Sequence, residues 1–166
     1  IVSARVDWRG QSPYSLAYDD GYFGSIDGLS EAQTVFIEAN RLPQRFGAMV
    51  AGEVFVIGET GFGTGLNLML AAQCFRDHAP QGARLQLIST DLHPLNAEDL
   101  SRALGHWPSL TKWADRLLKA YPAPAPGSHR LWLTDDIELT LMWGDALSRW
   151  SDSSASVDAW FLDGFV

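Results

Sequence analysis

The stretch "VFVIGETGFGTGLNLML" (residues 54–70) decides the fold, because three alternating glycines join an apolar run directly to a helical pattern. The run "VFVIG" is typical of a buried strand, and the residues after the glycines have helical spacing. Gly61, Gly63 and Gly65 indicate a tight strand-to-helix turn, since glycine tolerates positive φ angles and lets a ligand approach the backbone. Glu59 stands just before them. The stretch predicts a βα unit whose turn suits a ligand, although a tight turn without a ligand has the same pattern.

Strands and helices alternate along the rest of the chain, which indicates a mostly parallel sheet with helices on both faces. The predicted strands are "EVFVIG" (53–58), "ARLQLIST" (83–90), a hairpin in "HRLWLTDDIELTLMWGDA" (129–146) with Asp135 and Asp136 in its turn, and "VDAWFLDGF" (157–165). The predicted helices cover residues 29–43, 66–77, 96–107 and 110–121, with a break near Pro108. The fold class is therefore α/β, a doubly wound, mostly parallel sheet.

The helix predicted over residues 29–43 has its own boundary signals. Ser30 and Gln33 have the spacing of a capping box, and Pro43 disfavours continuation of the helix. The apolar stripe of this helix is predicted to consist of Ala32, Val35, Phe36 and Ala39.

The composition limits the class of protein. The chain has 166 residues, 46% of them hydrophobic, and a formal net charge of −8. This length suits one domain, and no apolar run approaches the roughly 20 residues of a membrane span. The single cysteine, Cys74, excludes an internal disulfide and suits the reducing cytoplasm, and we expect it to be a buried, inert thiol. Taken alone, the acidic charge argues against nucleic-acid binding, because such domains are usually basic.

Acidic residues follow the predicted strands at their carboxyl ends, where open α/β sheets bind ligands. Glu59 would attract an amino group, Asp91 can accept hydrogen bonds from both ribose hydroxyls, and Asp145 can face the amine of an adenine. S-adenosylmethionine combines these three parts. Local structural roles compete with this interpretation, because Asp91 and Asp145, taken singly, also fit as loop or helix-capping aspartates. The last of these acidic residues is Asp163, and we assign no metal ligands.

Several segments resemble one known family. "ETGFGTGLN", "LISTDLHPL", "WGDA" and above all "VDAWFLDGF" are similar to the methyltransferase domain of the MnmC family, bifunctional enzymes that finish 5-methylaminomethyl-2-thiouridine in tRNA. "DDGYF", "GLSEAQTVFIEANRL" and "RF" (residues 45–46) fit the opening pattern of that family. The glycine motif is shared with most class I methyltransferases, whereas the other segments are more specific. The likeness covers nearly the whole chain.

The resemblance implies that S-adenosylmethionine is the cofactor. It also implies that the methyl acceptor is the primary amine of 5-aminomethyl-2-thiouridine at the tRNA wobble position. Asp163 would lie near the reacting amine, either as a base or as a group that positions the amine or stabilises the cationic product. The predicted cofactor-binding residues are Glu59, Gly61, Phe62, Gly63, Gly65, Asp91 and Asp145. The candidates for stacking on a flipped base are Trp160, Phe161, Phe165 and Phe62, with burial in the strand favoured for the first two.

We expect residues 1–166 to form a single methyltransferase domain, with an N-terminal extension (1–50) and a cofactor-binding core (51–166), incomplete at its C-terminal end. The family continues after "LDGF" with an Ala-Pro pair and a further half-sheet, whereas Val166 takes the alanine position here. In many bacteria a flavin oxidase domain follows. FAD is therefore expected only with such a domain outside this chain, fused or as a partner. The expected partner of the domain itself is tRNA, and we expect no association with a membrane.

Three alternatives remain. A small-amine class I transferase, such as an aminopropyltransferase of the spermidine synthase type, shares the glycine turn and the acidic strand ends. The family-specific N-terminal segments argue against it. A non-catalytic binding module on the same fold predicts no affinity for S-adenosylmethionine. A nicotinamide dehydrogenase is disfavoured, because its G-x-G-x-x-G fingerprint differs from the E-x-G-x-G-x-G spacing found here.

Overall fold

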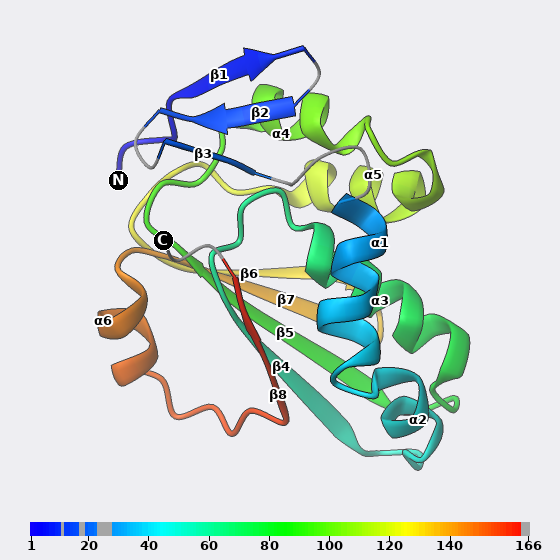
Figure 1. The fold of residues 1–166 in the computed structure, drawn as a ribbon. Helices are drawn as coiled ribbons and strands as arrows, with labels where there is room; N and C mark the ends of the chain where they lie inside the picture. Colours follow the sequence, from blue (N-terminus) through cyan, green and yellow to red (C-terminus); the bar gives the residue numbers. More distant parts are fainter. Residues whose placement is uncertain (11, 17–18, 23–27, 164–166) are drawn as a thin grey trace.

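A five-stranded sheet with the order β6-β7-β5-β4-β8 forms the centre of the computed structural model (Figure 1), which describes residues 1–10, 12–16, 19–22 and 28–163. Its strands are β4 (Val54–Thr60), β5 (Arg84–Asp91), β6 (Gly127–Thr134), β7 (Ile137–Trp143) and β8 (Ala159–Leu162). All neighbouring pairs are parallel except β6 with β7, which form the predicted hairpin around Asp135 and Asp136. The predicted α/β class with a mostly parallel sheet is confirmed.

Helices cover the sheet from both sides. The core helices are α3 (Leu66–His78), α4 (Ala97–Leu104), α5 (Thr111–Ala120) and α6 (Ala146–Ser151). In Figure 1, α3 lies on one side of the sheet and α6 on the other. A short 3₁₀ turn, η2 (Pro108–Leu110), precedes α5 and accounts for the predicted break near Pro108. Within the described ranges, no helix is long and apolar enough to cross a membrane.

The segment predicted as one helix over residues 29–43 is built differently. It contains α1 (Gly28–Ala32), a π-helix η1 (Gln33–Glu38) and α2 (Leu42–Gly47). Ser30 lies inside α1, so the predicted capping box is wrong. Pro43 falls in the first turn of α2, where a missing N–H costs nothing, so it does not end helical structure. The wider π turns bury Ile37 completely and leave Val35 49% exposed, which makes the predicted stripe wrong at Val35 and Ala39.

A small antiparallel sheet, which the sequence reasoning missed, lies N-terminal to these helices. It consists of β1 (Val6–Arg9), β2 (Ser12–Ser15) and β3 (Asp20–Gly21). The indole Nε1 of Trp8 donates to Asp99 Oδ1 on α4 at 3.0 Å, and the guanidinium of Arg102 lies 3.8 Å from the Trp8 ring centroid. These contacts fix the small sheet against α4.

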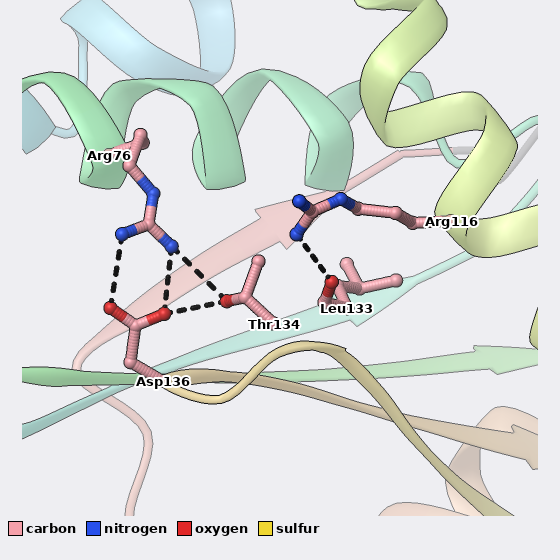
Figure 2. Close-up of polar contacts among 5 residues, drawn as sticks. All are labelled: Arg76, Arg116, Leu133, Thr134 and Asp136. Carbon is pink, nitrogen blue, oxygen red and sulfur yellow. Dashed lines mark hydrogen bonds and ion pairs between the residues drawn. The ribbon is translucent and has the colours of Figure 1, made fainter.

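Helix α3 is the central packing element. Its side chains are buried almost all round, from Leu66 to Phe75 with the exception of Gln73, so the helix packs on nearly every face. Cys74 is buried as predicted, and burial raises the pKa of its thiol to about 11, which keeps it protonated. At the end of α3, Arg76 Nη2 donates to Asp136 Oδ1 at 2.8 Å and also to Thr134 (Figure 2). This contact ties α3 to the β6–β7 turn.

Candidate active site at the carboxyl edge of the sheet

A cavity of about 550 Å³ opens at the carboxyl ends of the parallel strands. Strand β4 has β5 on one side and β8 on the other, so the order of the sheet reverses at β4. Ligands of open α/β sheets bind at such a reversal. The volume lies within the usual range for small-molecule sites, about 300–1,000 Å³. The predicted site residues that line it are Gly61, Phe62, Gly63, Asp91, Asp145 and Asp163.

The glycine turn forms one wall of the cavity. Gly61, Gly63 and Gly65 have φ angles of 84°, 53° and 73°, the left-handed region that the sequence pattern predicts. The backbone N–H groups of Gly61 and Phe62 both donate to Thr90 O at 3.0 Å, which fixes the turn to the end of β5. A Cβ at Gly65 would lie 2.8 Å from Phe62 Cζ, so this glycine makes room for the Phe62 ring beneath the turn. Gly65 is not among the residues that line the cavity.

Asp91 joins the glycine turn to the loop after β5. Its Oδ2 accepts from the backbone N–H of Gly63 at 3.0 Å, and its Oδ1 accepts from the N–H of His93 at 2.8 Å. Burial raises the pKa of the Asp91 carboxyl, and the two backbone hydrogen bonds act in the opposite direction. The side chain is half-buried and lines the cavity, so each oxygen keeps a lone pair for a ligand.

Glu59 lies behind the cavity wall rather than on it. The side chain is fully buried and does not line the cavity. Ser89 Oγ donates to Glu59 Oε2 at 2.6 Å, and Asn67 Nδ2 donates to Oε1 at 3.3 Å. Burial raises the pKa of Glu59 well above its ordinary 4.5, and the nearby negative charges of Asp163 and Asp91 add to this effect, against the lowering effect of the two hydrogen bonds. A carboxyl in such surroundings favours its neutral form.

Asp163 follows β8 directly and reaches the cavity from the opposite side of β4. The residue is exposed, and its Oδ2 accepts from Asn67 Nδ2 at 3.0 Å. Asn67 is the second residue of α3, is 7% exposed and lines the cavity. Sequence reasoning did not assign it a role, although it closes the motif "ETGFGTGLN". One amide nitrogen thus connects the buried Glu59 to Asp163.

Asp145 lies at the far rim of the cavity and caps a helix. Its Oδ1 accepts from the backbone N–H and the hydroxyl of Ser148, both at 2.9 Å, at the N-terminus of α6. These two hydrogen bonds lower the pKa of Asp145. The N-cap arrangement that competed with ligand binding in the sequence reasoning is therefore present. The side chain is exposed and lines the cavity, so capping does not prevent a ligand contact.

The aromatic residues of the site differ in their exposure. Phe62 is 2% exposed and its ring packs against Tyr121 and Trp143, with centroids at 6.2 Å and 5.8 Å. Phe161 is fully buried, whereas Trp160 is 42% exposed and packs against Trp150 at 4.4 Å between centroids. The expectation of burial in the strand is thus confirmed for Phe161 and wrong for Trp160, which lies on an edge strand. Phe165 lies outside the described residues.

The small N-terminal sheet supplies the roof of the cavity. Ser15, Gly21 and Tyr22 line it, and a Cβ built at Gly63 would lie 3.6 Å from Tyr22 Cδ1. The backbone N–H of Ala4 donates to Pro94 O at 3.1 Å, which anchors the segment before β1 to the loop after Asp91. The hydrophobic pattern of this segment does not indicate this contribution.

The wall of the cavity is acidic. Its carboxylates belong to Glu31, Asp91, Asp145 and Asp163, and among the described residues that line it there is no lysine or arginine. A concave site with one sign of charge concentrates ligands of the opposite sign, so this cavity favours cationic groups and disfavours phosphate. S-adenosylmethionine carries two cationic groups, a sulfonium and an ammonium, and both suit the carboxylates of this wall. Within the described part of the chain, no three His, Cys, Asp or Glu side chains gather closely enough to hold a metal ion.

Comparison with known proteins agrees with this geometry. Residues 108–166 match a family model described as S-adenosyl-L-methionine-dependent methyltransferase. A solved structure of MNMC2 from Aquifex aeolicus superposes with a TM-score of 0.69 over 100% of this chain and 50% of that chain, at 19% identity, which shows a common fold. The family model places residues 108–166 among the S-adenosylmethionine-dependent methyltransferases.

Two curated relatives narrow the class. The chain is 50% identical over 169 residues to the tRNA 5-methylaminomethyl-2-thiouridine biosynthesis bifunctional protein MnmC of Chromohalobacter salexigens, covering 99% of this chain and 24% of the relative. It is 51% identical over 168 residues to the protein of the same name from Pseudomonas fluorescens Pf-5, covering 100% of this chain and 26% of that relative. The chain corresponds to the methyltransferase domain of the MnmC proteins and spans about a quarter of the length of these relatives.

Proposed function

We propose that the protein containing this chain transfers the methyl group of S-adenosylmethionine to the amine of 5-aminomethyl-2-thiouridine at the tRNA wobble position. The observation that carries the proposal is the acid-lined cavity beside the glycine turn, which suits a cationic cofactor and an amine acceptor together. The relatives are named for the synthesis of 5-methylaminomethyl-2-thiouridine in tRNA, which is the product of this transfer. A tRNA substrate also implies a cytoplasmic location.

In this proposal the glycine turn and Asp91 hold the cofactor. Gly61 and Gly63 present backbone without side chains to the cavity, and Asp91 offers the remaining lone pairs of its carboxylate to the ribose hydroxyls. Asp145 offers the oxygen that Ser148 does not use to the adenine amine. Glu59 and Gly65 support this wall from behind, Glu59 through Asn67 and Gly65 by making room for the Phe62 ring. Phe62 lines the cavity and fills the space beneath the turn.

Asp163 acts on the amine. When bound, S-adenosylmethionine supplies a methyl group on a sulfonium, which is already a good leaving group. The amine must be neutral to attack, because the protonated ammonium has no lone pair. At neutral pH an alkyl amine is mostly in this protonated form. A carboxylate at the rim of the cavity can accept the proton or direct the lone pair by hydrogen bonding. The cavity residues contribute position and exclusion of water.

The test uses the full-length protein with tRNA that carries 5-aminomethyl-2-thiouridine and S-adenosylmethionine labelled in the methyl group. Transfer of label to that tRNA, and none to tRNA with an unmodified wobble uridine, is the expected result. Calorimetric titration with S-adenosylmethionine should show binding, whereas a non-catalytic module would show none. The absence of transfer from a folded, cofactor-binding protein would contradict the proposed acceptor.

The acidic wall also favours a second candidate, aminopropyl transfer to a small polyamine, because polyamines are cations. The same protein incubated with putrescine and decarboxylated S-adenosylmethionine distinguishes the two reactions. We expect no product in that mixture. A flavin oxidase domain, which would bind FAD, belongs to the proposal only as a fused or separate partner that makes the aminomethyl group.

A further inference from the structure

Asn67 occupies a position between two carboxyl groups of different kinds. Its Nδ2 donates to Asp163 Oδ2 at 3.0 Å in the cavity and to Glu59 Oε1 at 3.3 Å in the core. An amide nitrogen has two protons, so it can serve both acceptors at once. The opposite orientation of the amide would place its oxygen against two carboxyl groups, with no proton for an ionised one. The hydrogen-bond network therefore fixes which end of Asn67 faces them.

The two partners of Asn67 differ in burial, and this difference gives the arrangement a direction. Glu59 is fully buried and is held by Ser89 as well, so it cannot move without breaking the packing around α3. Asp163 is exposed and follows the end of edge strand β8, so its own surroundings restrain it less. A firmly held buried group on one side and an exposed rim group on the other make Asn67 a clamp for Asp163.

We propose that Asn67 is a positioning residue that holds the Asp163 carboxylate in the orientation needed for methyl transfer, with Glu59 and Ser89 as the buried support. This inference rests on the proposed function, because it concerns the step in which Asp163 acts. It assigns Asn67 no direct contact with the reacting amine. A misplacement of about 1 Å at a reacting group can lower a rate by about 100-fold, so removal of the clamp is expected to slow the transfer strongly.

The experiment measures single-turnover methylation and cofactor affinity in the full-length protein for Asn67→Ala and for the isosteric Asn67→Asp. Both remove the donors, and the second keeps the volume. We expect the transfer rate to fall by about 30- to 100-fold in both, with the Kd for S-adenosylmethionine and the KM for tRNA changed by less than about threefold. Gln73→Ala is the matched control, because Gln73 is an amide of the same helix that accepts from Trp113 Nε1 at 2.8 Å outside the cavity. It should lower thermal stability and leave the rate unchanged.

A double variant separates positioning from a general structural effect. If Asn67 acts through Asp163, Asn67→Ala combined with Asp163→Asn should be no slower than Asp163→Asn alone. The inference would be overturned if the rate losses of the two single variants multiplied in the double variant, or if folded Asn67→Ala or Asn67→Asp had a normal rate. Either result would leave the proposed function intact. An inactive wild-type protein would instead refute the proposed function, and the inference with it.

Discussion

The carboxylate of Asp91 accepts a hydrogen bond from the backbone N–H of Gly63 at 3.0 Å, and this contact connects the end of β5 to the middle of the glycine turn. The two residues lie in adjacent βα units and meet because β4 and β5 are parallel neighbours in register. The turn and the acidic strand end are therefore one structural unit. A ligand that contacts one of them also meets the other.

A Gly63→Val substitution tests this unit. Gly63 has φ of 53°, a conformation that costs an L residue about 1–2 kcal/mol and a β-branched one more. We expect the turn to rearrange, the Asp91 hydrogen bond to be lost and the affinity for S-adenosylmethionine to fall by at least about tenfold. Calorimetric titration measures the change. Gly52→Val is the matched control, since Gly52 has φ of 89° in a surface turn with open space around its Cβ position. Equal affinity losses in both variants would refute the site.

An Asp145→Ser substitution separates helix capping from ligand binding. Serine is as good an N-cap as aspartate, so α6 should keep its hydrogen bond to Ser148 and the thermal unfolding midpoint should change little. The carboxylate is lost, and with it the proposed contact to the adenine amine. We expect affinity for S-adenosylmethionine to fall by roughly tenfold. An unchanged affinity at unchanged stability would leave Asp145 as a helix cap alone.

The position of Glu59 shows what the sequence could and could not provide. The apolar runs and the three glycines were sufficient for the sheet and its binding edge, because both depend on local patterns. The side-chain alternation of a strand places Glu59 on the same face as Phe55 and Ile57, which are buried. Its burial could thus have been read from the sequence. Its connection to Asp163 could not, because Asn67 joins residues that are far apart along the chain.

Other parts of the site had no local signal. The strands of the N-terminal sheet are two to four residues long and rich in polar side chains, so periodicity cannot distinguish them from loops. The π-helix η1 changes which residues face the core, and a 3.6-residue period assigns Val35 to the wrong face. Asp91 and Asp163 line the cavity, because a strand end is a position that sequence patterns define well, and their roles stay predictions.

The raised pKa of Glu59 predicts how stability depends on pH. Above about pH 4.5 the unfolded chain releases the Glu59 proton while the folded chain retains it, so stability falls as the pH rises toward the folded pKa. Glu59→Gln removes this proton and keeps the shape. We expect the variant to gain stability relative to wild type by up to about 1.4 kcal/mol per pH unit above pH 4.5, until the folded pKa is passed.

Urea unfolding of both proteins at several pH values between about 4 and 8 measures the difference for Glu59→Gln. Near pH 4 the two should be nearly equal in stability. The introduced amide would keep a carbonyl oxygen that can accept from Asn67, so the transfer rate should fall less than in Asn67→Ala. A stability difference that does not change with pH would show that Glu59 is ionised in the folded protein.

The last prediction concerns Asp163 itself. Asp163→Asn removes the charge and basicity, while its amide oxygen can still accept from Asn67 Nδ2, so the clamp is kept. Loss of a general base or of a charge-assisted hydrogen bond is expected to lower the single-turnover rate by about 10²- to 10⁴-fold. Affinity for S-adenosylmethionine should change little, because Asp163 faces the amine in the proposed arrangement.

Rates measured from about pH 6 to about pH 10 distinguish the two roles, since an alkyl amine loses its proton toward the upper end of this range. If Asp163 is a base, the variant should recover part of its rate at high pH, where the amine is neutral without help. If Asp163 only directs the lone pair, the deficit should be the same at every pH. A wild-type rate in folded Asp163→Asn would exclude both roles.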